Sequence, residues 1–210
     1  MKSVEEQLLE HDGSRYQAAL GDVVRQLKPL VVVESGVQGG NSTLHILKAM
    51  DDVGCGHLHS IDPNPGLVLE HPRWTLWKER SVTAFAKIYR VANPWDIFLH
   101  DSDHDVGCQT FEYEAAWKFL RAGGLMVSDD VWWDQPTHYA WDKFVASQGL
   151  KDGRIGCAGS LYKPEKKSFQ HCPVNGAERV VTKAIKSAYF ASLKHGHSRS
   201  VAEYDPENFK

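Results

Sequence analysis

The sequence predicts an α/β fold: a doubly wound, mostly parallel sheet with helices on both faces and an antiparallel hairpin at one edge. Three observations predict it. Apolar runs of strand length alternate with helical patterns, the runs are continuous, and Gly and Pro lie between them. Continuous apolar runs are typical of strands that are buried on both faces, as in parallel sheets. Their alternation with helices indicates βαβ units.

Five apolar runs are expected to form the parallel strands. They are residues 30–35 (LVVVES), 57–62 (HLHSID), 74–78 (WTLWK), 96–101 (DIFLHD) and 125–130 (LMVSDD). Residues 153–163 (GRIGCAGSLYK) have the pattern of a β-hairpin. This hairpin would add antiparallel strands at one edge of the sheet.

The helices are expected between these runs, where apolar residues recur at helical spacing. The first is residues 14–28, with Ser14 as its N-cap and Pro29 after its end. The others are residues 42–50, 81–91, 109–120 (closed by Gly123 and Gly124), 136–147 and 176–195. The last is amphipathic, and we expect it to cover a hydrophobic surface or to form a homodimer contact.

One main domain is expected, because no internal repeat or low-complexity tract divides the chain. Its size is ordinary for a single hydrophobic core. We divide the chain into an N-terminal helical segment (1–28), the main α/β domain (29–165) and a C-terminal helical extension (166–210).

Charge and composition exclude several classes of protein. The net charge is −3 with a pI of about 6.4, and acids and bases are mixed, so nucleic acid is not an expected partner. No apolar run reaches the roughly 18 residues of a membrane span, and the N-terminus is too acidic for a signal peptide, so a cytoplasmic protein is expected. The four cysteines form no C-x-x-C pair and are expected to be reduced thiols.

Acidic residues stand at the ends of four predicted strands. Ligands bind at the carboxyl ends of strands in open α/β sheets, near the point where the strand order reverses. A single carboxylate there is often only a helix N-cap. Four strand ends with acids favour a binding site instead; these acids are Glu34, Asp62, Asp101, and the pair Asp129 and Asp130.

Residues 34–42 (ESGVQGGNS) form a glycine-rich turn after the first strand. Glycine lets the backbone turn tightly and approach a ligand, and Ser42 would open a helix with free N–H groups. The dinucleotide pattern G-x-G-x-x-G is not met, because Gln38 occupies the second glycine position, so a nicotinamide cofactor is disfavoured. Asp62 ends the next strand, where a carboxylate accepts hydrogen bonds from ribose hydroxyls. The turn and Asp62 together predict a nucleoside ligand.

Four motifs together resemble class I S-adenosylmethionine-dependent methyltransferases, which have a Rossmann-like sheet. They are E-x-G-x-x-x-G-x-S at 34–42, HSID at 59–62, DIFLHDSDH at 96–104 and LRAGGLMVSDDV at 120–131. The resemblance covers residues 28–134. It is strongest to the branch of metal-dependent O-methyltransferases of macrolide and aminocoumarin sugars, with cephalosporin hydroxylase-like relatives.

The resemblance implies a role for each matching residue, with residues 29–165 as the cofactor-binding domain. Glu34, Gly36, Gly40 and Ser42 would hold the methionine moiety of the cofactor and Asp62 its ribose. Ser81 would contact adenine, although it suits a helix N-cap equally well. Asp101 would lie against the cofactor and also bind metal.

The same resemblance assigns a metal and a base to the acidic residues. Asp101, Asp129 and Asp130 would ligate a divalent cation, Mg²⁺, and Asp103 would take the proton of the acceptor hydroxyl. The physical argument agrees, since converging carboxylates repel one another and a hard cation neutralises them. His104 is a second candidate base, because histidine ordinarily titrates at about pH 6.5. Some relatives place a histidine base where this chain has Trp132.

The expected function is an O-methyltransferase that acts on a hydroxyl of a small molecule, such as a sugar or a natural product. Trp132, Trp133, His138 and Tyr139 would overhang the acceptor side, although Trp133 and Trp141 suit the core as well. Two alternatives stay open. One is a metal-dependent hydrolase that uses the same acids, and the other is a non-catalytic methyltransferase-like binding module.

Overall fold

The computed structural model describes residues 2–9, 16–131, 135–155 and 158–164 of the chain. Seven strands lie in this part. They are β1 Val31–Ser35, β2 His57–Ile61, β3 Trp74–Trp77, β4 Trp95–His100, β5 Leu120–Ser128, β6 Gly153–Ile155 and β7 Ala158–Tyr162. All seven form one sheet, in the order β3-β2-β1-β4-β5-β7-β6.

The first five strands are parallel, and the last two form an antiparallel edge. β1 pairs in parallel with β2 on one side and with β4 on the other, while β7 is antiparallel to both β5 and β6. The predicted fold class, with its edge hairpin, is thereby confirmed. The strand order reverses between β1 and β4, so the carboxyl ends of these strands mark the expected binding crevice.

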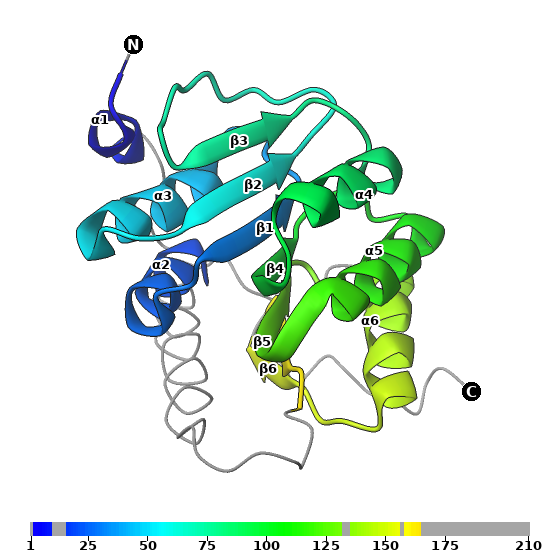
Figure 1. Ribbon diagram of the computed structural model, residues 1–210. Coiled ribbons are helices and arrows are strands. Elements are labelled where there is room, and N and C mark those ends of the chain that lie inside the picture. Colours follow the sequence, from blue (N-terminus) through cyan, green and yellow to red (C-terminus); the bar gives the residue numbers. More distant parts are fainter. Residues whose placement is uncertain (1, 10–15, 132–134, 156–157, 165–210) are drawn as a thin grey trace.

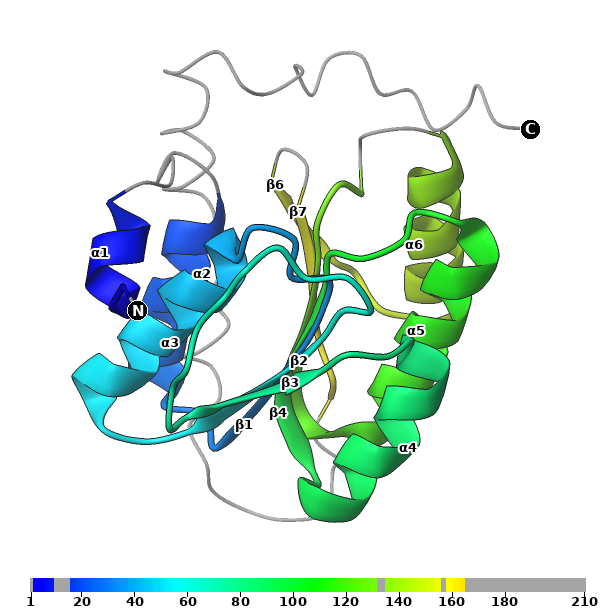
Figure 2. The same ribbon diagram turned by 90° about the horizontal axis from the view of Figure 1, so that it is seen from above.

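The helices of the described residues cover both faces of the sheet (Figures 1 and 2). α1, α2 and α3 lie on one face, and α4, α5 and α6 lie on the other. Their bounds are α1 Val4–Leu8, α2 Tyr16–Leu27, α3 Asn41–Val53, α4 Ser81–Val91, α5 Val106–Phe119 and α6 Gln135–Gln148. No helix of the described residues is both long and apolar enough to cross a membrane.

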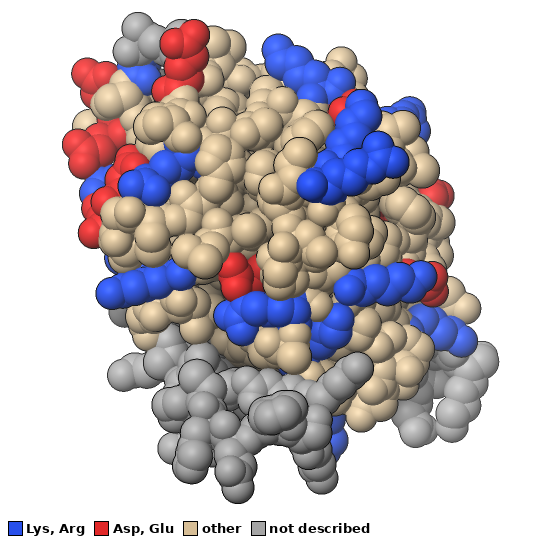
Figure 3. All heavy atoms as spheres, viewed as in Figure 1, with Lys and Arg blue, Asp and Glu red and all other residues tan. Residues whose placement is uncertain are grey.

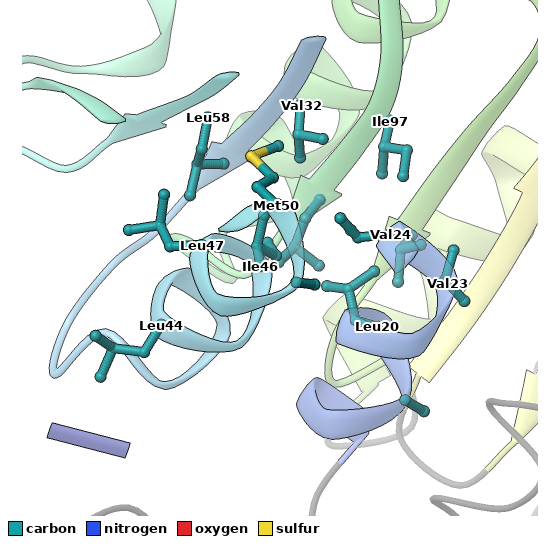
Figure 4. Packing of buried hydrophobic residues seen from close by; sticks show 14 of the residues in the cluster. Leu20, Val23, Val24, Val32, Leu44, Ile46, Leu47, Met50, Leu58 and Ile97 are labelled. Carbon is teal, nitrogen blue, oxygen red and sulfur yellow. The ribbon is translucent and has the colours of Figure 1, made fainter. Parts of the chain in front are cut away.

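The core on the first face forms where α2 and α3 pack on the sheet (Figure 4). On α2, Leu20, Val23 and Val24 recur at helical spacing and are almost fully buried. They contact buried residues of α3 and of three strands, namely Leu44, Ile46, Leu47, Met50, Val32, Leu58 and Ile97. Each large aliphatic side chain buried in this way contributes about 1.5–3 kcal/mol to folding.

The core on the second face is aromatic. Phe85 of α4 meets Trp95 and Phe98 of β4 edge to face, with ring centroids 5.3 and 5.7 Å apart. Trp141 of α6 is fully buried and donates from its indole Nε1 to Asp152 at 2.6 Å. Trp141 is therefore a core residue, which is one of the two places that the sequence allowed for it.

Both ends of α5 differ from the prediction. α5 begins at Val106, earlier than residue 109, because the Asp105 side chain accepts from the N–H groups of Gly107 and Cys108 and caps the helix there. Gly123 and Gly124 do not close α5 but belong to β5, where they exchange backbone hydrogen bonds with Lys163.

α3 begins at Asn41, one residue before Ser42, and its N-cap is Gly40 in the left-handed region at φ 88°. The expected N-cap at Ser14 and the expected helix over 176–195 lie outside the described residues. Of the four cysteines, Cys55 and Cys108 are free thiols, as expected.

Candidate cofactor and metal site

The glycine-rich turn after β1 passes against the end of β4. Gly36 has φ 93° and donates its N–H to the carbonyl of Ile61 at 2.8 Å. A Cβ atom on residue 36 would lie 1.7 Å from the carbonyl oxygen of Asp101. Residue 36 must therefore be glycine for two reasons, its backbone conformation and the close approach of another backbone.

Gly40 is restricted in a similar way. It also has a positive φ, and a Cβ atom there would meet Leu67 at 2.6 Å. The loop that carries Leu67 is held in place, because the N–H groups of Gly66 and Leu67 both donate to the carbonyl of Gln38. The loop between β2 and β3 therefore packs directly on the glycine-rich turn.

Asp62 joins the same turn to the end of β2. One carboxylate oxygen accepts from the N–H groups of Val37 and Gln38, both at 3.0 Å, and the other accepts from Asn64 at 2.7 Å. The residue expected to bind ribose thus also shapes the glycine-rich turn. A carboxylate that is fixed by three backbone donors presents a defined acceptor to a ligand at this edge.

Glu34 is fully buried in β1 and binds hydroxyl groups. Its carboxyl group accepts from Ser42 at 2.5 Å, Thr43 at 2.7 Å and Ser60 at 2.6 Å. Burial raises the pKa of Glu34, and the three hydroxyl groups oppose that shift. Glu34 and Ser42, both expected to hold the methionine moiety, lie together and bond each other.

Three carboxyl groups meet where β4 and β5 end. Asp101 follows β4, and Asp129 and Asp130 follow β5. Burial first, then the charges of Asp129 and Asp130, raise the pKa of Asp101 well above its ordinary value. The hydroxyl of Tyr16, at 3.4 Å, opposes this shift. The structure therefore brings together the three acids that the sequence singled out as metal ligands.

The backbone at this cluster is tightly constrained. The N–H of Asp129 donates to the carbonyl of His100 at 2.9 Å, and the N–H of Asp130 donates to the side chain of Asp129 at 2.8 Å. Asp130 has φ 52°, in the left-handed region where non-glycine residues are uncommon. Such conformations concentrate at functional sites, where the surrounding structure holds them.

The two candidate bases lie beside this cluster. Asp103 is exposed and accepts from the N–H of Asp105 at 3.2 Å. His104 is half-buried, and its Nε2 lies 3.8 Å from a carboxylate oxygen of Asp130. His104 thus contacts the acidic cluster directly, and Asp103 precedes it in the loop after β4.

The cluster does not form a complete set of protein ligands on its own. Across residues 2–9, 16–131, 135–155 and 158–164, no three His, Cys, Asp or Glu side chains have the arrangement that holds a metal ion. Mg²⁺ ordinarily keeps several waters and takes only one or two carboxylates. The oxygen donors and mutual repulsion of Asp101 and Asp129 fit such an ion.

Glu112 of α5 is a buried acid behind the site that the sequence did not single out. Its carboxylate accepts from Ser35 at 2.9 Å, from Ser102 at 3.1 Å and from Nδ1 of His100 at 2.8 Å. Burial opposes ionisation, but hydrogen bonds from His100 and then Ser81 and Ser35 outweigh it and lower the pKa of Glu112. The sequence offers only a weak signal, because helical spacing places Glu112 on the same face of α5 as the buried Tyr113 and Ala116.

Ser81 is the first residue of α4, not its N-cap, which is Arg80. Its hydroxyl instead helps to lower the pKa of Glu112. Of the residues that would overhang the acceptor side, His138 is half-buried and Tyr139 is exposed. Trp132 and Trp133 lie outside the described residues.

The strand order and the site at its carboxyl edge define a Rossmann-like methyltransferase fold. Residues 33–131 match the family model described as Methyltransferase domain. This segment contains the glycine-rich turn, Asp62 and the acidic cluster. Residues 33–131 are thus similar to a methyltransferase domain, as the four motifs indicate.

Solved structures share this fold. MycE methyltransferase from the mycinamycin biosynthetic pathway, in complex with Mg and S-adenosylhomocysteine, is 17% identical with a TM-score of 0.58, over 73% of this chain and 51% of MycE. An O-methyltransferase from Bacillus cereus, in complex with S-adenosylhomocysteine, is 17% identical with a TM-score of 0.56. The match covers 78% of this chain and 92% of the Bacillus protein. TomG from Streptomyces achromogenes, an O-methyltransferase involved in tomaymycin synthesis, is 16% identical with a TM-score of 0.53. The match covers 70% of this chain and 79% of TomG.

This chain spans about half the length of MycE. The sequence matches no curated protein at a significant level.

Proposed function

We propose that this protein is an S-adenosylmethionine-dependent O-methyltransferase that acts on a hydroxyl group of a small molecule with the help of a divalent cation. One observation carries the proposal. At a single edge of the sheet, the glycine-rich turn fixed by Asp62 lies against Asp101, whose pKa is raised first by burial and then by the charges of Asp129 and Asp130. A nucleoside site and an acidic cluster are thus adjacent.

The cofactor would bind along the carboxyl ends of β1 and β2. Asp62 is held as an acceptor by the backbone of the turn, which suits a pair of ribose hydroxyls. Gly36 and Gly40 leave the turn without side chains where the methionine moiety would lie. When bound, S-adenosylmethionine supplies an electrophilic methyl group on a sulfonium ion.

The cation would bind at Asp101 and Asp129, with Asp130 adjacent. Asp129 is only 3% exposed, so an unneutralised cluster is costly. A hard cation offsets the repulsion that raises the pKa of Asp101, and it lowers the pKa of a hydroxyl that it binds. MycE, which was solved with Mg, supports this choice of ion.

The protein's part in the reaction is to orient the acceptor and to remove one proton. The acceptor oxygen forms a bond to the methyl carbon as the bond from that carbon to sulfur breaks. The proton of the hydroxyl passes to Asp103 or His104, which lie beside the cluster. The products are a methyl ether and S-adenosylhomocysteine, and orientation supplies much of the rate.

The acceptor class is a hydroxylated small molecule, such as a sugar or a natural product. The pathways named for MycE and TomG support natural-product chemistry. The surface in Figure 3 carries Lys and Arg in separate groups, with uncharged surface and acidic residues between them. That pattern differs from the continuous basic surface that binds a phosphate backbone.

Thermal unfolding tests the cofactor and the cation together. S-adenosylhomocysteine or NAD is added, each with Mg²⁺ or with EDTA. A ligand at about 100 times its dissociation constant stabilises the native state by roughly 2.7 kcal/mol, which raises the midpoint by a few degrees. We expect a shift with S-adenosylhomocysteine and none with NAD. The absence of any shift with S-adenosylhomocysteine would refute the proposal and favour a hydrolase.

A further inference from the structure

A single buried carboxylate connects four segments beneath the candidate site. Glu112 is 1% exposed on α5, yet its partners come from three other segments. They are Ser35 at the end of β1, His100 at the end of β4 and Ser102 in the loop after β4. Cys108, on the same helix, also donates from its Sγ to Glu112 at 3.7 Å.

Three partners of Glu112, namely Ser35, His100 and Ser102, are each next in the chain to a predicted site residue. Ser35 lies between Glu34 and Gly36 in the chain. A shift of Ser35 would therefore move the start of the glycine-rich turn.

The partners of Glu112 at the end of β4 are also next to a predicted site residue. His100 and Ser102 flank Asp101 on both sides, so Glu112 fixes the backbone that carries Asp101. The carbonyl of His100 also accepts from the N–H of Asp129, which extends this support to the end of β5. The position of Asp101 relative to Asp129 thus depends on where His100 is held.

We infer that Glu112 is a positioning residue, which sets the spacing between the glycine-rich turn and the acidic cluster without touching either ligand. This inference rests on the proposed function. Its physical basis is that partners behind a binding site orient the groups that bind, and their loss commonly costs about 10–100-fold in affinity or activity. A buried carboxylate with four donors is also rigid, because breaking any one bond leaves a buried polar group unsatisfied.

The fold offers a matched control at the opposite edge of the sheet. Asp96 of β4 is also a carboxylate that connects strands: it accepts from the N–H groups of Leu30 and Val31, both at 2.8 Å, and from Arg121 at 2.5 Å. These contacts lie at the amino ends of the strands. Loss of Asp96 should therefore weaken the fold without changing the distant site.

The experiment compares Glu112→Gln with Asp96→Asn. The dissociation constant of S-adenosylhomocysteine is measured by calorimetry at a temperature well below the unfolding midpoint of each variant. We expect Glu112→Gln to raise that constant at least about tenfold. Asp96→Asn should lower the unfolding midpoint and leave the constant within about twofold of the wild type, since nothing in the site depends on it.

A second variant keeps the inference testable if the Glu112→Gln protein does not fold. Ser102→Ala removes one donor of 3.1 Å and leaves the carboxylate its other partners. We expect it to fold and to raise the dissociation constant about threefold, less than Glu112→Gln, because the other donors still hold the carboxylate.

Three results would overturn the inference. A Glu112→Gln protein with wild-type affinity would do so, and so would an unfolded Glu112→Gln protein together with a Ser102→Ala protein of wild-type affinity. A wild-type protein that binds no S-adenosylhomocysteine would instead refute the proposed function, and the inference with it.

Discussion

The backbone at Gly36 passes so close to Asp101 that the carbonyl oxygen of Asp101 occupies the space of a Cβ atom on residue 36, at 1.7 Å. This contact joins the predicted cofactor turn to the first acid of the predicted metal cluster. It also makes the two halves of the candidate site mechanically dependent on each other. A substitution in the turn should therefore displace Asp101 and disturb the acidic cluster.

Gly36→Ala is the most direct test of this contact. The added methyl group would clash with the backbone of Asp101, which cannot rotate away as a side chain could. β1 and the segment at Asp101 must therefore move apart. We expect a loss of at least about 2 kcal/mol in the free energy of unfolding and no detectable binding of S-adenosylhomocysteine. Urea unfolding and calorimetry measure the two effects.

Gly54→Ala is the matched control for that substitution. Gly54 also has a positive φ, of 71°, but a Cβ atom there would meet nothing within 4 Å. It should cost about 1 kcal/mol from backbone conformation alone and leave the affinity for the cofactor unchanged. Equal losses for both substitutions would show that the contact with Asp101 has no special role.

Asp62→Ala tests whether Asp62 binds the ribose of the cofactor. The substitution removes the acceptor of the Val37 and Gln38 N–H groups and the expected partner of ribose. Because hydrogen bonds to a charged group contribute about 1.5–3 kcal/mol, the dissociation constant of S-adenosylhomocysteine should rise at least about tenfold. Asp22→Ala, which removes an exposed acid of α2 that pairs with Arg25, should change nothing measurable. Wild-type affinity in Asp62→Ala would contradict the assignment of the ribose site.

Asp129→Asn tests the cation. The substitution removes one negative charge that raises the pKa of Asp101. We expect the metal-free protein to be as stable as the wild type or more so, because repulsion is relieved. The rise of the unfolding midpoint with Mg²⁺ should disappear, methyl transfer should fall at least about 100-fold, and binding of S-adenosylhomocysteine should persist.

The control for Asp129→Asn is Asp152→Asn, a half-buried acid that accepts from Trp141 at the start of the edge hairpin. It should keep the response to Mg²⁺. Full turnover of Asp129→Asn, or of the wild type in EDTA, would remove the cation from the mechanism.

His59 should make stability depend on pH. Burial lowers its pKa from 6.5 to about 4 in the folded protein. Between these values the unfolded state binds more protons, so stability falls as the pH falls from 6.5 towards 4. From pH 7 to pH 5, His59 alone should cost at most about 2 kcal/mol.

Urea unfolding of the wild type and of His59→Gln at both pH values isolates this contribution, because all other groups titrate in both proteins. We expect the difference in stability between pH 7 and pH 5 to be smaller in His59→Gln. An identical difference in the two proteins would mean that His59 takes up its proton as readily when folded as when unfolded.

The fold could be predicted because its signals are local and repeated. Runs such as residues 30–35 are apolar at every position, which only a strand covered on both faces requires. The order of these runs and helices then leaves few topologies, since crossovers between parallel strands are right-handed. The boundary of α5 was missed because Gly123 and Gly124 suit a helix end as well as a strand that turns beside Lys163.

The site could be predicted only as a list of residues. Asp62, Asp101 and Asp129 follow from strand ends, because parallel strands finish at one edge. Their contacts do not follow, since the distance between two strand ends depends on twist and on packing beneath them. Glu112 was missed for the same reason: an acid in a helix is ordinarily solvated, and its four donors come from positions up to 77 residues away in the chain.

The carbonyl of Gln38 receives the N–H groups of Gly66 and Leu67, so two loops share one set of hydrogen bonds over the site. Neither loop can open alone without leaving those amides to exchange with solvent. Deuterium uptake at Gly66 and Leu67 therefore reports the opening of the glycine-rich turn. Slower uptake there as cofactor is added would show that the bound cofactor holds both loops closed.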